Sequence, residues 1–240
     1  MIRTATATLA AALCLSAAVP FAASAADPAV GGGTAAPQGG GTAATGTGST
    51  LRAGRGALLG RWQRVAGTLA GAAAGRSLLI QRTDGHSGWV TVARARTGRQ
   101  GGFSTSWRPD RVGRLTLRAV PAAGSTTAQA SAGPAPTAPT TVYATAIATQ
   151  FGPGFFGRRT ACGVVLTTAT IGVAHTRLPC GTLVEFYYRG RTVRAPVIDR
   201  GPYANGATWD LTTGAARALA FDGLSYVGSL VVGHVNLRRG

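Results

Sequence analysis

The chain has 240 residues and a formal net charge of +17, because 24 basic residues, all of them Arg, stand against 7 acidic ones. GC-rich codon usage explains Arg in place of Lys but not the scarcity of Asp and Glu, so the charge predicts a polyanionic partner. No basic stripe is interleaved with aromatic residues, so nucleic acid is only a minor alternative to anionic wall polymers or lipid headgroups.

Residues 1–25 have the pattern of a secretory signal peptide. Arg3 supplies the positive start, an apolar run follows, and Ala23-Ser24-Ala25 is a small-residue cleavage site. A lipoprotein would use Cys14, but this residue lies inside the apolar run and follows a large Leu. A transmembrane anchor is disfavoured because the run is short for a bilayer. We expect a secreted, wall-associated protein with no stable membrane insertion after cleavage.

Residues 26–57 are mostly Gly, Ala, Thr and Pro and predict a disordered spacer. From 58 to 120 apolar and polar residues alternate with a period of two, which indicates half-buried strands. The predicted strands are Trp62–Leu69, Ser77–Arg82, Trp89–Arg96, Phe103–Trp107 and Leu115–Ala119. By pattern, this region predicts a small immunoglobulin-like β-sandwich that acts as a spacer or adheres to the wall.

Residues 121–141 are rich in Pro, Ala and Thr and predict an extended, semi-stiff linker. Residues 142–240 predict further strands and one short Ala-rich helix. The predicted strands are Val142–Gln150, Thr182–Tyr188, Arg191–Asp199 and Ser229–Leu237, and the predicted helix is Thr212–Phe221. Many strands and one helix in so short a span favour a small closed barrel, which makes the whole protein all-β.

Only Cys162 and Cys180 remain after signal cleavage. Two thiols in an exported protein most simply form one disulfide, which would contribute about 3 kcal/mol on the chain-entropy model. A metal site is disfavoured because there is no C-x-x-C and no cluster of His. We therefore expect a disulfide, no metal and no cofactor.

One His and two Asp lie at predicted loop edges of this region, where sites on β scaffolds are usually built. His175 precedes a Leu-Pro-Cys-Gly turn, Asp199 ends a strand, and Asp210 follows a Gly-containing loop. The other two carboxylates, Glu185 in mid-strand and Asp222 at a helix end, predict structural or solvated groups.

Each of the three residues also has a structural alternative. Asp199 could cap its turn or pair with Arg200, which would lower its pKa and make it a poor acid. Asp210 could cap the predicted helix, and His175 could be a hydrogen-bonded loop residue. Asp210 could cap the helix and act in the site at the same time.

Five motifs follow one another along the C-terminal region: A-T-x-F-G at Ala148–Gly152, F-x-G-R-x-T-A-x-G at Phe155–Gly163, V-A-H-x-x-L-P-x-G-T-x-V at Val173–Val184, D-R-G-P-Y at Asp199–Tyr203 and D-L-T at Asp210–Thr212. In this order and spacing, residues 143–237 resemble the rare lipoprotein A-like double-psi β-barrel family. That six-stranded fold is shared with expansins and some endoglucanases. The cysteine pair suits the disulfide-bearing actinobacterial members.

The resemblance implies action on peptidoglycan. Some family members are lytic transglycosylases, which need a proton-shuttling group and leave an anhydro-sugar product; expansin relatives loosen wall polymers without cleaving them. The resemblance assigns Asp199 as the shuttle, supported by His175 and Asp210. An open polysaccharide groove would offer stacking aromatics and one cation as substrate contacts, although any of the aromatic residues could instead belong to the core: Tyr203, Trp209, Phe155, Phe156 and Arg200.

Val164 stands where catalytic relatives carry a Glu. Its loss favours a non-cleaving, expansin-like wall-binding module, whereas the retained Asp/His/Asp set favours a lytic transglycosylase with a reduced site. A structural or partner-binding protein is a third class. In the first two cases the expected partner is peptidoglycan or another anionic wall polysaccharide, bound by a monomer.

Overall fold

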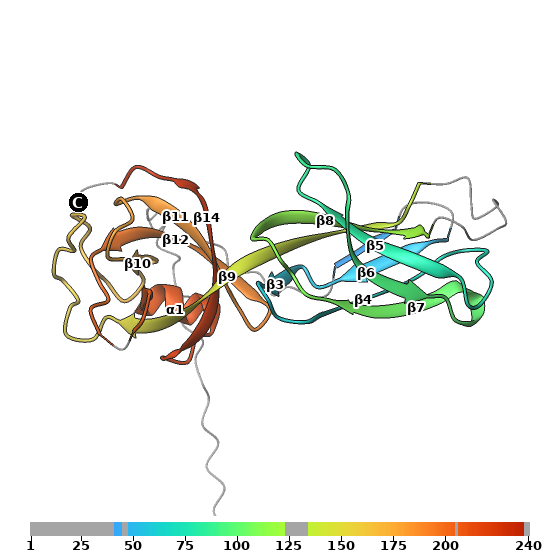
Figure 1. Cartoon of the computed structure of the whole chain (residues 1–240). Coiled ribbons are helices and arrows are strands. Elements are labelled where there is room, and N and C mark those ends of the chain that lie inside the picture. Colours follow the sequence, from blue (N-terminus) through green and yellow to red (C-terminus); the bar gives the residue numbers. More distant parts are fainter. Residues whose placement is uncertain (1–40, 45–47, 123–133, 205, 238–240) are drawn as a thin grey trace, which may run out of the picture. The chain divides into compact units, whose positions relative to one another are not determined.

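A computed structural model describes residues 41–44, 48–122, 134–204 and 206–237 (Figure 1). The predicted signal peptide at 1–25 lies outside these residues, as do parts of the predicted spacer and linker. Within them the protein is all-β apart from one short α-helix and a 3-10 turn at Arg99–Gly101, which confirms the predicted class. No helix of the described ranges is long and apolar enough to cross a membrane.

The N-terminal part is a sandwich of two β-sheets. One sheet has the order β1 (Gly41–Ala44), β2 (Thr50–Ala53), β4 (Gln63–Thr68), β7 (Gly102–Trp107). The other has the order β9 (Thr137–Phe151), β8 (Gly113–Pro121), β5 (Ser77–Thr83), β6 (Val90–Arg96), and β3 (Gly56–Leu58) also pairs with β9. A single core contains side chains of both sheets, as face-to-face packing requires: Leu51, Val65, Phe103 and Trp107 from the first, and Leu78, Ile80, Leu115 and Leu117 from the second.

The sandwich extends beyond the predicted range of 58–120 on both sides. Leu51 is fully buried in β2, a strand that lies within the predicted spacer and pairs with β4. At the other end β9 begins at Thr137, inside the predicted linker, and buries Ala138. Composition misjudged these segments because backbone pairing, and not large side chains, holds most of each strand in place.

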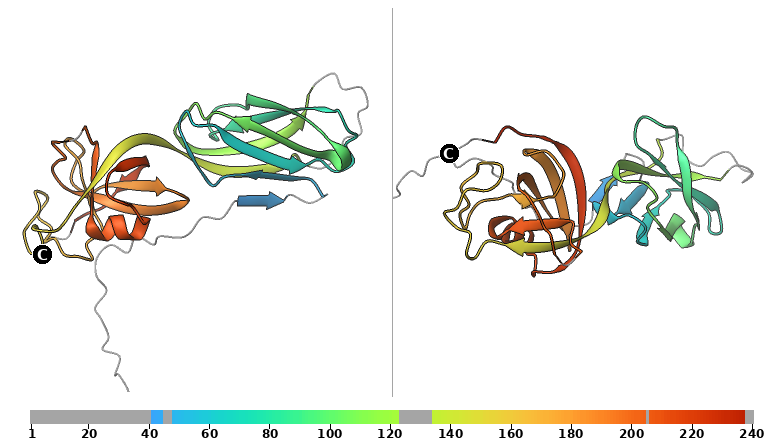
Figure 2. Two further views of the ribbon diagram at one scale, coloured as in Figure 1. Left: turned by 90° about the horizontal axis from the view of Figure 1, so that it is seen from below. Right: turned by 60° about the vertical axis from the view of Figure 1, so that its left-hand side comes forward.

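The C-terminal part is a closed six-stranded barrel. Its strands run in the order β13 (Trp209–Thr212), β10 (Val173–Ala174), β12 (Arg191–Asp199), β11 (Thr182–Tyr188), β14 (Ser225–His234), β9. Pairing of β13 with β9 closes the sheet (Figure 2). The core inside includes Val184, Phe186, Val197 and Leu211. The predicted closed barrel with one short helix is therefore confirmed. The long strand β9 belongs both to the barrel and to the sandwich sheet that contains β8.

The buried hydroxyl group of Thr212 caps the start of helix α1 (Thr213–Leu219) and makes three hydrogen bonds. Thr212, which is fully buried, accepts a hydrogen bond from Ala215 N at the helix start, as an N-cap does. The same Oγ1 donates to Thr170 O at 2.6 Å and accepts from Gly172 N at 3.1 Å. One side chain thus ties the helix to the segment that leads into β10.

Candidate active site

The strand pairing brings both predicted aspartates beside one residue of β10. Ala174 pairs in parallel with Asp199 of β12 and antiparallel with Asp210 of β13. Because neighbouring strands lie about 4.8 Å apart, the two aspartates are about 10 Å apart at the backbone. His175 follows Ala174 directly, and its backbone N–H donates to Asp199 O at 3.2 Å. The three residues therefore meet where β10 ends.

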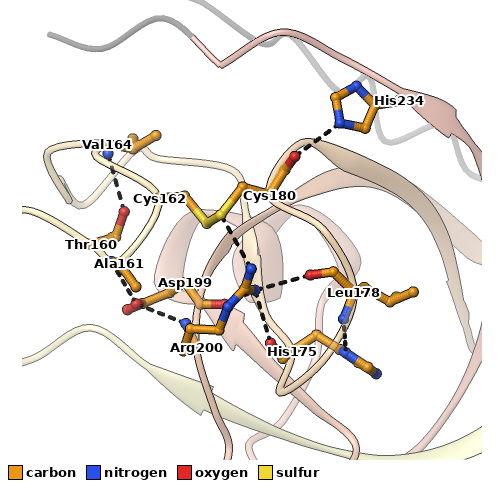
Figure 3. The surroundings of a disulfide bond; sticks show 10 residues. All are labelled: Thr160, Ala161, Cys162, Val164, His175, Leu178, Cys180, Asp199, Arg200 and His234. Carbon is orange, nitrogen blue, oxygen red and sulfur yellow. Dashed lines mark hydrogen bonds between the residues drawn. A yellow bond between two sulfur atoms is a disulfide. The ribbon is translucent and has the colours of Figure 1, made fainter.

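Asp199 is held by backbone donors. Its Oδ1 accepts hydrogen bonds from Ala161 N and Arg200 N, both at 2.9 Å (Figure 3). Within the described residues, Oδ2 has no hydrogen-bond partner. Asp199 does cap its turn, as the structural alternative supposed, but it keeps one oxygen for other chemistry.

His175 is held as a neutral imidazole with a defined tautomer. Its Nδ1 faces the backbone N–H groups of Arg177 at 3.1 Å and Leu178 at 3.0 Å and accepts from both, so the ring proton belongs on Nε2. Burial, and then the charges of Arg200 and Arg177, lower the pKa of His175. The side chain thus presents one N–H donor at Nε2.

The pKa of Asp210 is shifted in the opposite direction to that of His175. Burial raises the pKa of its carboxyl, and the charge of Asp199 raises it further, while a hydrogen bond from Thr149 opposes the shift. That bond joins Thr149 Oγ1 to Asp210 Oδ1 at 2.8 Å. A carboxyl that keeps its proton to higher pH is suited to donate it. Asp210 does not cap helix α1, since Thr212 does.

Thr149 was not singled out from the sequence, although it is the second residue of the A-T-x-F-G motif. The motif is a recognisable signal, but its contact with Asp210 depends on the parallel pairing of β9 with β13. The backbone N–H of Ala161 was missed for a similar reason, because a main-chain donor has no signature in the sequence.

Cys162 and Cys180 form the predicted disulfide, with an S–S distance of 1.99 Å. Arg200 lies against it: its guanidinium contacts Cys180 Sγ at 3.4 Å and donates to His175 O at 3.2 Å and Leu178 O at 3.0 Å (Figure 3). The guanidinium predicted to contact substrate is thus engaged with the loop that carries the histidine. This geometry favours a positioning role for Arg200.

The predicted stacking aromatics divide into two groups. Trp209 is only 5% exposed and packs against His175, with ring centroids 4.5 Å apart, so it supports the imidazole and has no free face for a sugar. Its Nε1 has no acceptor among the described residues. Phe155, Phe156 and Tyr203 are 52%, 38% and 82% exposed and offer open ring surface.

The remaining carboxylates of the barrel are engaged elsewhere. Glu185 accepts hydrogen bonds from Tyr143 Oη at 2.8 Å and from Arg194 Nε at 2.9 Å. Asp222 accepts one from Tyr188 Oη at 2.6 Å. Val164 brings no carboxylate to the site. In the described part of the chain, no group of three metal-binding side chains occurs.

Residues 143–235 match a double-psi β-barrel family model described as "Lytic transglycolase". Over 75 residues the chain is 44% identical to "Probable endolytic peptidoglycan transglycosylase RlpA" of Synechocystis sp.. It is 40% identical over 79 residues to the protein of that name in Aquifex aeolicus, and 37% identical over 75 residues to "Endolytic peptidoglycan transglycosylase RlpA" of Campylobacter jejuni. The chain is therefore similar to RlpA proteins, and its residues 143–235 match the double-psi β-barrel family.

These matches cover 30%, 32% and 30% of this chain, and 23%, 35% and 27% of the three relatives. The chain therefore spans about a third or less of each relative it matches. The β-sandwich before Tyr143 lies outside the family match. Among solved structures, "Streptomyces papain inhibitor (SPI)" is 27% identical, with 36% of this chain and 92% of that chain covered and a TM-score of 0.29.

Proposed function

We propose that this protein acts on the glycan strands of peptidoglycan as a secreted, wall-associated lytic transglycosylase, with its site on the RlpA-like barrel. The observation that carries the proposal is the pair of carboxyl groups on either side of Ala174, one biased to keep a proton and the other held by N–H donors. Two carboxyl groups in such different surroundings can supply an acid and a base.

Protonated Asp210 donates its proton to the glycosidic oxygen, and the bond between that oxygen and the sugar C1 breaks with its electron pair on the oxygen. Asp199 accepts the proton of the same sugar's C6 hydroxyl, whose oxygen bonds to C1 and closes an anhydro ring. No water is consumed, and proton exchange with solvent restores both carboxyl groups. The resemblance assigned both transfers to Asp199, whereas the burial of Asp210 and the N–H donors at Asp199 favour dividing them.

The other residues bind and position the glycan. His175 donates its Nε2 hydrogen to a sugar oxygen, and Phe155, Phe156 and Tyr203 stack on sugar rings. Arg200 holds the loop that carries His175. We propose that the sandwich is an immunoglobulin-like module, that the protein works as a monomer, and that its cysteine pair places it among the disulfide-bearing actinobacterial members of the family.

The decisive experiment is digestion of purified peptidoglycan by the mature protein, with mass spectrometry of the released glycans. Anhydro-sugar ends should appear with the wild type and with the control Asp222→Asn, which lies outside the site and keeps an acceptor for Tyr188. They should disappear with Asp199→Asn and with Asp210→Asn. A wild-type protein that releases no anhydro ends would overturn the enzymatic assignment.

Val164 favours a second candidate, a non-cleaving module that binds and loosens the wall. Such a protein would sediment with insoluble wall and leave the glycan chains intact. Val164→Glu separates the two functions. If restoring the carboxylate is what allows cleavage, this variant releases anhydro ends and the wild type does not.

A further inference from the structure

Most of the positive charge of this protein is carried by the sandwich. Residues 48–122 contain 13 Arg and only two acidic residues, whereas residues 134–237 contain eight Arg and four acidic residues. Both acidic residues of the sandwich are already paired: Asp110 with Arg82 at 2.6 Å and Asp84 with Arg111 at 3.0 Å. The sandwich therefore contains many more arginines than carboxylates of its own.

Four of these arginines share the outer face of the sheet that contains β5, β6 and β8. Arg114 is ion-paired with Glu185 of the barrel, which leaves Arg94, Arg96 and Arg118. Residues opposite each other in antiparallel strands point to the same face, and the register shows these pairs: Arg94 with Leu79, Arg96 with Ser77, and Arg118 with Gln81. The alternate residues Leu78 and Ile80 are buried in the core, so this face points to solvent.

An exposed tryptophan lies on the same face. Trp89, just before β6, is 37% exposed, and the guanidinium carbon of Arg118 lies 4.0 Å from the centre of its ring. Arg118 Nε also donates to Gln81 Oε1 at 2.8 Å. These contacts fix the guanidinium, and within the described residues both of its NH₂ groups lack a hydrogen-bond partner. We call Trp89, Arg94, Arg96 and Arg118 the Arg/Trp face.

This arrangement is unfavourable for the isolated protein, because like charges on neighbouring positions of one face repel each other. None of the three arginines lies within ion-pair distance of a carboxylate in the part of the chain that the structure describes. An anionic ligand removes the repulsion. Arginine binds carboxylates through two parallel hydrogen bonds, and an indole ring stacks on a sugar, so the combination fits an acidic polysaccharide.

We propose that the Arg/Trp face is a second binding surface for peptidoglycan, on which Trp89 contacts a sugar ring and the three arginines contact carboxylates of the polymer. The proposal rests on the proposed function, since it takes the barrel's substrate as its ligand. The sandwich then anchors the enzyme to an insoluble polymer while the barrel acts on single glycan bonds.

Sedimentation of the mature full-length protein with insoluble peptidoglycan measures this binding. Arg94→Gln/Arg96→Gln should weaken the affinity about tenfold, as expected for the loss of charged hydrogen bonds, and Trp89→Ala should also weaken it. The matched control is Arg52→Gln/Arg64→Gln, which removes the same charge from exposed positions of β2 and β4 in the other sheet and should change affinity less than about twofold. Circular dichroism and thermal melting establish that each variant is folded.

Peptidoglycan whose carboxylates have been amidated is the second probe, and it should bind the wild type about as weakly as intact polymer binds the Arg94/Arg96 variant. If the Arg94/Arg96 variant and the Arg52/Arg64 control lose the same affinity, net charge alone attracts the polymer and the proposal is overturned. Wild-type affinity in the Arg94/Arg96 and Trp89 variants would also overturn it. Failure of the proposed function can be distinguished from failure of this proposal, because anhydro ends would then be missing while binding to peptidoglycan persists.

Discussion

His175 and Asp210 are both partly removed from water, yet burial acts on their charges in opposite directions. Burial disfavours the charged form of each group, so it lowers the pKa of the histidine and raises the pKa of the aspartate. Both side chains are consequently neutral over a wider pH range than in free solution. The site therefore contains two neutral donors beside the hydrogen-bonded carboxyl group of Asp199.

Two substitutions of His175 separate its nitrogen atoms. His175→Asn keeps an acceptor near the place of Nδ1 and loses the Nε2 donor, so glycan cleavage should fall at least tenfold while the melting temperature changes little. His175→Gln reaches the place of Nε2 but leaves the N–H groups of Arg177 and Leu178 without an acceptor, so its melting temperature should fall. Digestion assays and thermal melts measure both effects. Equal melting temperatures for the two variants would argue against the assigned tautomer.

Asp210 should control the alkaline limb of the pH–activity profile. Its protonated form is the acid, so activity is present below the raised pKa and is lost as pH increases through it. Burial penalises the ionised form, so Asp210→Asn should be more stable than the wild type at pH 7. Its melting temperature should be higher by about 2–4 °C for each kcal/mol gained in unfolding free energy. Below the ordinary pKa of aspartate the two proteins should melt at the same temperature. A variant that melts lower than the wild type at pH 7 would contradict this.

At the scale of elements, the disulfide joins the two loops that supply the site. Cys162 follows Ala161, whose N–H donates to Asp199, and Cys180 ends the loop held by His175 and Arg200. The strand β10 between these loops has only two residues, so it contributes few hydrogen bonds of its own. The disulfide therefore holds together two loops that the short strand β10 fixes only weakly.

The variant Cys162→Ser/Cys180→Ser should lose about 3 kcal/mol of unfolding free energy, because the open chain regains loop entropy when it unfolds. Cleavage should also fall at temperatures where the variant is folded, since the N–H of Ala161 is no longer held at Asp199. Chemical denaturation measures the first effect and digestion the second. Dithiothreitol should lower the stability of the wild type and leave the variant unchanged; a wild type indifferent to reduction would contradict the prediction.

For the whole molecule, the two proposals place binding of the polymer on the strongly charged sandwich and cleavage on the barrel. Added salt screens the exposed arginines of the sandwich, with a Debye length near 10 Å at about 0.1 M, but it barely affects the neutral donors of the barrel. A barrel that cleaves and a sandwich that anchors should therefore respond differently to salt.

Raising the NaCl concentration should reduce cleavage of insoluble peptidoglycan strongly and cleavage of short soluble glycan fragments little. The Arg94→Gln/Arg96→Gln variant should show the weaker salt response on both substrates, because its anchoring charges are already removed. Released anhydro ends are counted in each case. The same steep salt dependence on soluble fragments would place the relevant charges in the barrel instead.

The strands that show local alternation were predictable. β11 and β12 have the boundaries that the sequence predicted, Thr182–Tyr188 and Arg191–Asp199. β10 and β13 were missed because two and four residues are too short to show a period. For Trp209 both a sugar contact and a place in the core were open, because residue type alone does not distinguish an aromatic ring in a core from one on a surface.

The sequence by itself determined the all-β class, the closed barrel and the disulfide, and it identified His175, Asp199 and Asp210 as candidate site residues, because these follow from local alternation, export and short motifs. Only the tertiary structure decided which carboxyl keeps its proton, which nitrogen of His175 carries one, and which arginines share a face with Trp89. Proton affinity depends on burial and on donors from distant strands, and a shared face depends on register. Both arise when separate segments pair.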